Sequence, residues 1–213
     1  MSYHKIPRVI AIVVGLAGLM AIAGWVFDVQ FLKSLSFSLV PMKFVSAICF
    51  ALAGVIIFVL SDVVHDAPEV GPIISSVATL IITIVMASLL FSKFIGINCG
   101  IESLFIKESY CPPETVLPGQ PSVATMICFL LIAVLDILAK LKVWYWRGAF
   151  IVTGCVIGSA GIGSLIGYAT GDISMAHYVP GFSSAMSFFS ATLFSLIGIT
   201  IIMLGVRHKN LPQ

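Results

Sequence analysis

The chain has 213 residues, of which 60% are hydrophobic and only 9% are charged, and its formal net charge is +2. An ordinary soluble domain is about 45–50% apolar and about 25% charged, so this composition excludes a water-soluble globular domain, a disordered chain and a coiled coil. The small net charge provides no basic surface for nucleic acid. Membrane lipids are the expected surroundings, because at about 20 residues per crossing the apolar content suffices for about six transmembrane helices.

Six apolar stretches are predicted to cross the membrane as helices, since each has the length of about 17–24 residues that a crossing requires. They cover residues 7–27, 42–60, 72–94, 122–138, 148–168 and 183–206. The alternating segments of about ten residues that mark a membrane β-barrel are absent from the sequence. Lipid cannot satisfy open backbone groups, so only helices remain. We therefore predict an all-α membrane protein that forms a single transmembrane domain over residues 1–213.

The distribution of Lys and Arg near the span ends predicts the orientation. One side would carry seven of them: Lys5, Arg8, Lys140, Lys142, Arg147, Arg207 and Lys209. The other side would carry four: Lys33, Lys43, Lys93 and Lys107. This bias predicts a multi-pass protein of the inner (cytoplasmic) membrane with both termini in the cytoplasm. The predicted cytoplasmic loop 61–71 fits less well, because it holds three acidic residues and no Lys or Arg.

Two of the spans begin with the same motif. Residues 42–54 and 186–198 share Met, Phe, Ser, Ala, Phe, Leu and Gly at identical offsets, which is seven of thirteen positions. The principal positions are Met42, Ser46 and Phe50 in one copy and Met186, Ser190 and Phe194 in the other. The span before each copy ends with a glycine and an aromatic residue, Gly24-Trp25 and Gly167-Tyr168.

These matches predict three repeated helical hairpins, over about residues 7–60, 72–138 and 148–206. Each hairpin would have one helix going out, an amphipathic extracytoplasmic connector and one helix returning. The fourth span shares less, with Thr125, Cys128 and Phe129 at the motif positions. A chance likeness between apolar helices is the alternative. The repeat requires the first span, and therefore argues against a cleaved signal peptide, which the basic start and Ala21-Ile22-Ala23 would otherwise permit.

The Gly24-Trp25 pair, the short connector and the Met-x-x-x-Ser-Ala-x-x-Phe-x-Leu-x-Gly motif together resemble a membrane sensor region. That region lies before the signalling domains of some bacterial hybrid histidine kinases and diguanylate cyclases. The resemblance covers nearly the whole chain and implies a sensory input module, here without an output domain after Gln213. The middle hairpin departs from the pattern, because Pro121 stands where the motif has methionine.

The first connector, residues 28–41, places Phe31, Leu32, Leu35 and Leu39 at roughly helical spacing with polar residues between them. This pattern predicts a short amphipathic helix in the headgroup plane. The helix would be either a membrane anchor or one wall of an outward pocket formed by the three connectors. Asp28 is predicted to pair with Lys43 across the first hairpin.

The other two connectors each contain residues of interest. In the second, residues 95–121, Cys99 and Cys111 lie twelve apart in an extracytoplasmic loop. This spacing predicts a disulfide, with free thiols or a metal site as alternatives. The third, residues 169–182, contains His177, which is either plain polar surface or a group that senses pH or contacts a ligand.

Few polar side chains lie within the predicted spans. Asp136 is the only acid well inside an apolar run, and it lies one helical turn from Lys140, with which it can form an ion pair. An intramembrane acid is a functional candidate, although its place near a helix end also suits a structural role. Lys43 lies near the outer end of its span, where its amine can reach the interface.

The fifth span is rich in glycine and contains Gly154, Gly158, Gly163 and Gly167 in two Gly-x-x-x-Gly pairs. Small residues at this spacing allow helix backbones to approach closely. We expect this helix near the centre of the bundle, packed internally, with dimerisation through it as the alternative.

No catalytic motif, phosphate-binding loop or metal-binding motif occurs in the sequence, so we expect no enzymatic activity, no cofactor and no metal. The first functional hypothesis is a sensor or regulatory module that recognises a small or lipid-like ligand, or a partner, at its extracytoplasmic face. The second is an accessory or scaffold subunit of a larger membrane complex, and a small transporter or channel is a third. The first two imply a protein partner or a homo-oligomer in the membrane.

Overall fold

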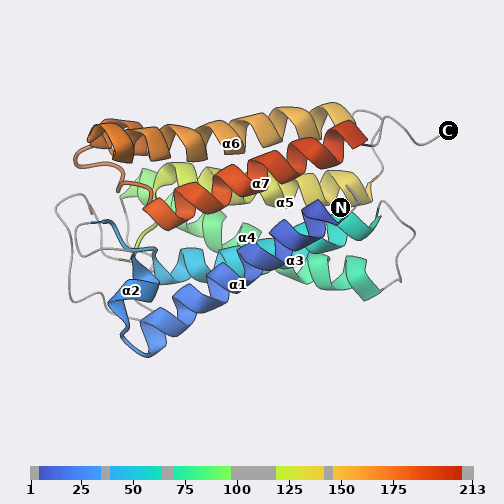
Figure 1. Ribbon diagram of the computed structural model, residues 1–213, viewed down its shortest axis with the longest axis horizontal. Coiled ribbons are helices and arrows are strands. Elements are labelled where there is room, and N and C mark those ends of the chain that lie inside the picture. The colour runs from blue at the N-terminus through green and yellow to red at the C-terminus, as the bar shows by residue number, and fades with distance from the viewer. Residues whose placement is uncertain (1–4, 35–38, 64–69, 97–118, 142–145, 208–213) are drawn as a thin grey trace.

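The computed structural model describes residues 5–34, 39–63, 70–96, 119–141 and 146–207 (Figure 1). Within these ranges the helices are α1 (Ile6–Val26), α2 (Gln30–Lys33), α3 (Phe44–Val63), α4 (Val70–Ile95), α5 (Val123–Lys140), α6 (Trp146–Thr170), the 3-10 helix η2 (Ile173–Ala176) and α7 (Phe188–Arg207). The same ranges contain no β-strand, and only one isolated antiparallel bridge joins Val179 to Ser183.

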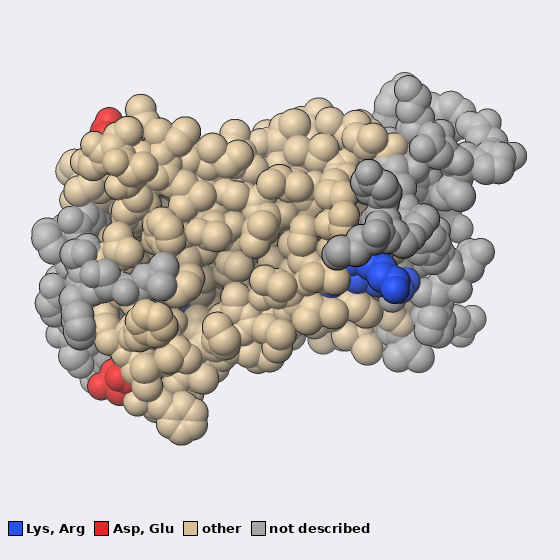
Figure 2. Space-filling view, viewed as in Figure 1, with Lys and Arg blue, Asp and Glu red and all other residues tan. Residues whose placement is uncertain are grey.

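Six of these helices are long and apolar enough to cross a membrane: α1, α3, α4, α5, α6 and α7. In Figure 2 uncharged side chains cover the body of the molecule, and the charged side chains in view lie toward its two ends. The predicted all-α fold with six membrane-spanning helices is confirmed, and the chain is a multi-pass membrane protein in contact with lipid. The helix bounds agree with the predicted spans to within three residues, except that α7 begins at Phe188 and not at residue 183.

The six long helices form an inner and an outer set. In the inner helices α3, α5 and α7, 67%, 44% and 61% of the span residues are buried, against 28%, 33% and 33% in the outer helices α1, α4 and α6. Each outer helix packs on two inner ones: α1 on α3 and α7, α4 on α3 and α5, and α6 on α5 and α7. The prediction that the glycine-rich fifth span lies at the bundle centre is therefore wrong, because α6 is an outer helix.

One phenylalanine from each inner helix meets in the middle of the core. The ring centroids of Phe50 and Phe129 are 4.8 Å apart, those of Phe50 and Phe194 are 4.8 Å apart, and those of Phe129 and Phe194 are 5.1 Å apart. All three side chains are fully buried, and their tilted or edge-on contacts are those that aromatic rings prefer. The three inner helices are thus held around a single aromatic cluster.

Two of the outer helices approach their inner partners backbone to backbone. A Cβ atom added to Gly54 of α3 would lie 2.6 Å from the Gly15 Cα of α1. In the same way, a Cβ added to Gly198 of α7 would lie 2.5 Å from the Gly158 Cα of α6. Such contacts are open only to glycine, and they supply the close packing that joins helices where hydrophobic burial gives no driving force.

The bundle has two distinct ends, which differ in the chain segments that lie there. The start of α1 and the end of α7 lie at one end of the bundle, which we call the termini end, while α2 and η2 lie at the opposite end, which we call the connector end (Figure 1). At the connector end α2 follows α1 and η2 follows α6 after a residue with positive φ, Asp28 at 56° and Gly171 at 74°.

Two further kinds of contact occur in both the α1–α3 hairpin and the α6–α7 hairpin. The Trp25 indole N–H donates to the Met42 carbonyl at 2.8 Å, and the Tyr168 hydroxyl donates to the Met186 carbonyl at 2.7 Å. The backbone N–H of each methionine donates to the short helix before it, Met42 to Lys33 and Met186 to Ala176, both at 2.9 Å. These matching contacts support the repeat, which stays an inference from the sequence.

Candidate functional site

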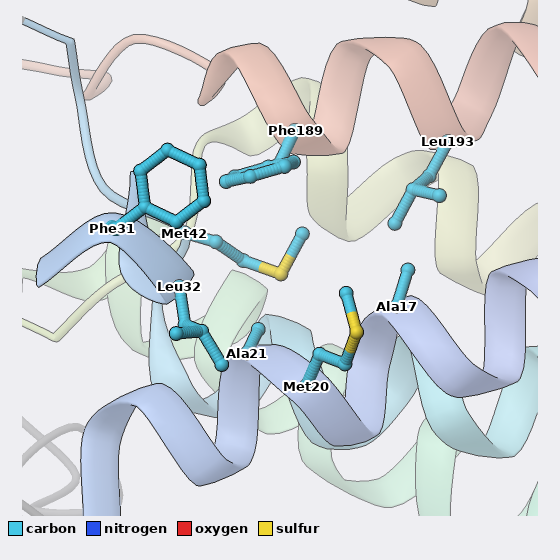
Figure 3. Close-up of a pocket in the computed structure, with 8 residues that line it drawn as sticks. All are labelled: Ala17, Met20, Ala21, Phe31, Leu32, Met42, Phe189 and Leu193. Atoms are coloured by element: carbon cyan, nitrogen blue, oxygen red, sulfur yellow. The ribbon is translucent and has the colours of Figure 1, made fainter. Parts of the chain in front are cut away.

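An apolar pocket lies near the connector end, between α1, α2 and α7. Its volume is about 270 Å³. Figure 3 shows side chains of α1, α2 and α7, together with Met42, converging on it. The lining residues are Ala17, Met20 and Ala21 of α1, Phe31 and Leu32 of α2, Met42 just before α3, and Phe189 and Leu193 of α7. All eight side chains are apolar, so they offer a ligand apolar contacts only.

The pocket has a buried floor and an exposed rim. Met42 is 1% exposed, Ala21 3% and Leu193 5%, whereas Met20 is 58% and Phe31 67% exposed. The rim therefore lies at the surface of the bundle, beside an outer helix. The volume is just below the roughly 300–1,000 Å³ of pockets for drug-sized molecules. It is nearly twice the cavity of about 150 Å³ that holds one benzene, so the space suffices for a small apolar molecule or part of a hydrocarbon chain.

Local sequence explains why α2 folds against α1. Asp28 adopts a left-handed backbone with φ 56°, a conformation that Asp tolerates better than most residues, and the Val29 N–H then donates to the Gly24 carbonyl at 2.9 Å. Gly24 leaves room for α2, since a Cβ there would lie 2.6 Å from the Leu32 Cβ. The α2 turn is thus placed with Phe31 and Leu32 over the pocket.

Lys33 fixes the other side of α2. It forms an ion pair with Asp28, and its Nζ lies 4.5 Å from the centroid of the Trp25 ring, a cation–π distance. Asp28 therefore pairs with Lys33, and the prediction that it pairs with Lys43 is wrong. Lys43 itself is 5% exposed; it lies just before α3.

Met42 connects the pocket to the inner helices. Its side chain lines the pocket, its carbonyl accepts from Trp25 and its N–H donates to the Lys33 carbonyl. Ser46 and Phe50 follow it on successive turns of α3, and both are buried. Helix α2 is therefore hydrogen-bonded to the segment that lies just before an inner helix.

The second copy of the motif is also buried, but it lies against α6. The Met186 sulfur lies 3.6 Å from the Ser164 Oγ of α6. Ser187 caps α7, since its Oγ accepts from the Ser190 N–H at 3.1 Å. Ser122 caps α5 in the same way, accepting from the Thr125 N–H at 3.1 Å, so the middle hairpin shares this detail.

Asp136 lies in the opposite half of the bundle, at the termini end of α5, and is fully buried. It forms the predicted ion pair with Lys140, and its Oδ2 also accepts from the Thr79 Oγ1 of α4 at 2.6 Å. The predicted hairpin over residues 72–138 pairs α4 with α5, but Thr79 was not foreseen as the partner of Asp136, because no local pattern connects residues 57 positions apart.

His177 is exposed and has a left-handed backbone with φ 59°. Its Nε2 lies 3.3 Å from the Ala160 carbonyl of α6. The imidazole therefore lies along α6 and is not among the residues that line the pocket.

The glycines of α6 face different surroundings. A Cβ on Gly154 would meet α7 within 2.9 Å, and one on Gly167 would lie 2.9 Å from the Met175 Cβ of η2. Gly158 faces Gly198 of α7, whereas a Cβ on Gly163 would have nothing within 4 Å. Three of the four predicted packing glycines thus contact the rest of the chain.

The remaining predicted site lies outside the described residues: Cys99 and Cys111, whose disulfide stays a prediction. Among the residues that the structure describes, no group of three or more His, Cys, Asp or Glu side chains could hold a metal ion. The first connector forms one wall of a pocket, as one hypothesis proposed. However, helices α1 and α7 supply the facing walls, and no residue that the structure describes in the other two connectors lines it.

Comparisons with protein families, with curated proteins and with solved structures gave no match.

Proposed function

We propose that the protein is a non-enzymatic membrane sensor or regulatory module that binds a lipid-like ligand in the apolar pocket at its connector end. The observation that carries this proposal is the pocket of about 270 Å³ between α1, α2 and α7, in which every lining side chain that the structure describes is apolar. The resemblance of the repeated motif to a membrane sensor region points the same way.

The apolar lining favours a hydrocarbon chain as the ligand. A chain that moves from the bilayer into the pocket gains no hydrophobic free energy, because lipid is as apolar as the lining. Selection among lipids therefore depends on how well each one fits. A fatty acid or similar amphiphile has only one chain to place, so it suits a pocket of about 270 Å³ better than a phospholipid with two chains.

A ligand transmits a signal only if it binds two conformations with different affinity. Phe31 and Leu32 lie on α2, and the next residue, Lys33, accepts the Met42 N–H through its carbonyl. A chain that enters between α2 and α1 therefore shifts the start of α3. From there the displacement reaches Phe50 and the aromatic cluster shared by the three inner helices, and a separate protein would read the shift at the termini end.

A transport function is less well supported by the inner helices. On α5 the buried side chains between Thr125 and Asp136 are Met126, Cys128, Phe129, Ile132, Ala133 and Leu135. Thr125 and Asp136 are eleven residues apart, or about 16 Å along the helix, and these six side chains between them include no charged or hydrogen-bonding group other than a thiol. An ion or polar solute would meet an apolar barrier there.

The binding proposal can be tested with Trp25, which adjoins the pocket through Met42. In a Trp144→Phe, Trp146→Phe background Trp25 is the sole tryptophan, since the chain has three. Titration of the protein in detergent micelles with a dibrominated fatty acid should quench Trp25 fluorescence to a saturating level. Ala21→Leu fills the pocket and should reduce the saturable part at least several-fold.

Ala87→Leu is the matched control, because it adds the same side chain at an exposed position of α4. It should leave the saturable quenching unchanged. Quenching that rises without saturation, or that Ala21→Leu leaves intact, would show that the pocket holds no ligand of this class. Purification in a fixed stoichiometry with another membrane protein, in the absence of saturable binding, would favour the accessory-subunit alternative.

A further inference from the structure

A second site, which unlike the pocket is polar, lies at the termini end, where α4 packs on α5. It is independent of the pocket. The Asp136 carboxylate of α5 is 1% exposed, and the Lys140 side chain, one turn further along, is 24% exposed. Lys140 bonds to the Asp136 Oδ2 and also donates to the Ser76 Oγ of α4 at 2.9 Å. Together with the hydrogen bond from Thr79 at 2.6 Å, these contacts connect the two helices.

The two oxygens of the Asp136 carboxylate differ in their hydrogen bonds. Oδ2 accepts from both Thr79 and Lys140, whereas Oδ1 is buried and has no hydrogen-bond partner among the described residues. An ionised carboxylate in a low-dielectric interior requires donors for its charge, and a neutral acid requires far less. The ionised form therefore depends on Lys140.

Among the described side chains of the helices that pack on α5, no other charged group can replace Lys140. These helices are α3, α4 and α6, and the one charged group among their described side chains is Lys93 of α4. Lys93 lies fourteen residues beyond Thr79, or about 21 Å along the helix. The other titratable side chains that the structure describes on these helices and on α5 are Cys49, Cys128, Cys155 and Tyr168, and none of them hydrogen-bonds to Asp136.

We propose that Asp136 is the binding site of a single proton, which it exchanges with water at the termini end when Lys140 turns away. Lys140 keeps its own proton and swings its amine to the interface, as long basic side chains near helix ends do. The carboxylate then takes a proton from hydronium. An O–H bond forms at Asp136, a water molecule is released, and the neutral acid stays buried.

Proton uptake changes how α4 is attached to α5. The bond from Thr79 to Asp136 persists, because a neutral acid still offers an acceptor oxygen. The ion pair and the bond from Lys140 to Ser76 are lost together, since both are made by the same amine. The apolar stretch of α5 toward Thr125 separates the site from the connector end, so the proton enters and leaves on one side only.

Infrared spectroscopy of the full-length protein in lipid nanodiscs tests this inference, because a protonated carboxyl has its own carbonyl stretch. The wild type should gain this band on acidification, in excess of an Asp136→Asn variant that keeps the shape and the acceptor for Thr79. The other eight acidic residues are common to both proteins and cancel in the difference. Identical titrations of the two proteins would overturn the proposal.

Variants of Lys140 form the second part of the infrared experiment. Lys140→Met should show the carboxylic acid band already at neutral pH, and the double variant with Asp136→Asn should lack it. Lys140→Arg keeps a permanent cation and should resemble the wild type at neutral pH. If the band is absent from Lys140→Met, Asp136 stays ionised without its partner and the proposal is wrong. Should Lys140→Met not fold, the comparison of wild type with Asp136→Asn decides alone.

Discussion

Trp25 and Tyr168 make the same hydrogen bond in two different hairpins: each donates from its aromatic side chain to the carbonyl of the methionine two residues before the following inner helix, at 2.8 and 2.7 Å. The donor is an indole N–H in one case and a phenol O–H in the other. The contact therefore depends on the position of the donor, at the end of an outer helix, and not on the identity of the ring.

Removal of one of these bonds should destabilise its hairpin. Tyr168→Phe keeps the ring and removes only the donor, so it should lower the free energy of unfolding by about 0.5–1.5 kcal/mol. Unfolding in mixed micelles by titration with denaturing detergent measures this quantity. Tyr178→Phe is the control, because the Tyr178 hydroxyl makes no hydrogen bond to the described residues, and an equal loss there would mean that the Met186 bond is not stabilising.

Two glycines of α6 should respond oppositely to the same substitution. A Cβ at Gly161 would lie 2.6 Å from the Ala191 carbonyl oxygen, whereas one at Gly163 would have nothing within 4 Å. Gly161→Ala should therefore cost about 1–3 kcal/mol through overpacking. Gly163→Ala should be neutral or stabilise by up to about 1 kcal/mol through helix propensity. Equal effects in the same unfolding assay would contradict the packing of α6 on α7.

The aromatic cluster should contribute less than its size suggests. In soluble cores Phe→Ala costs about 3–5 kcal/mol, but here the unfolded reference is a helix in lipid, so most of the transfer term disappears. Phe129→Ala should lower the unfolding free energy by less than this range, chiefly through the cavity it leaves. Phe91→Ala, at a side chain 66% exposed, should have almost no effect, and a cost as large as that of Phe129→Ala would contradict the assignment of the core.

The cap of α5 gives a further test. The Ser122 Oγ accepts from the Thr125 N–H at 3.1 Å, so Ser122→Ala should cost about 0.5–2 kcal/mol. Ser159 is exposed and its hydroxyl donates to the Val156 carbonyl at 2.9 Å within α6. Ser159→Ala should leave the melting temperature within error of the wild type, and the difference between the two variants measures the cap.

The six spans were predictable because lipid admits few alternatives to apolar helices, and each boundary is marked by polar residues. The start of α7 was not, since residues 183–187 are as buried as the helix that follows. Their course is set by backbone bonds of the Ser183 N–H to the Val179 carbonyl and of the Met186 N–H to the Ala176 carbonyl. Hydropathy counts residues that avoid water but does not distinguish helix from buried extended chain.

The pocket was only partly predictable. The periodicity of the first connector identified Phe31 and Leu32 as one apolar wall, but the opposite wall is formed by Phe189 and Leu193, more than 150 positions later. Likewise, Lys33 and Lys43 both follow Asp28 closely enough in sequence to pair with it. The left-handed turn at Asp28 brings Lys33 to it and not Lys43. Such choices depend on how helices cross, which a single sequence does not specify.

The glycine contacts also distinguish the hairpins by the kind of contact that joins their two helices. In the first and third hairpins the helix backbones meet directly, at Gly15 and Gly54 and at Gly158 and Gly198. These contacts carry no charge, so acidity, salt or voltage leaves them unchanged. The middle hairpin has no glycine on α5, and its helices are joined instead by hydrogen bonds between the charged pair of α5 and the side chains of Thr79 and Ser76 on α4. With the proposed uptake of a proton by Asp136, acidity at the termini end changes the contacts of this one hairpin and leaves the glycine contacts of the other two as they are.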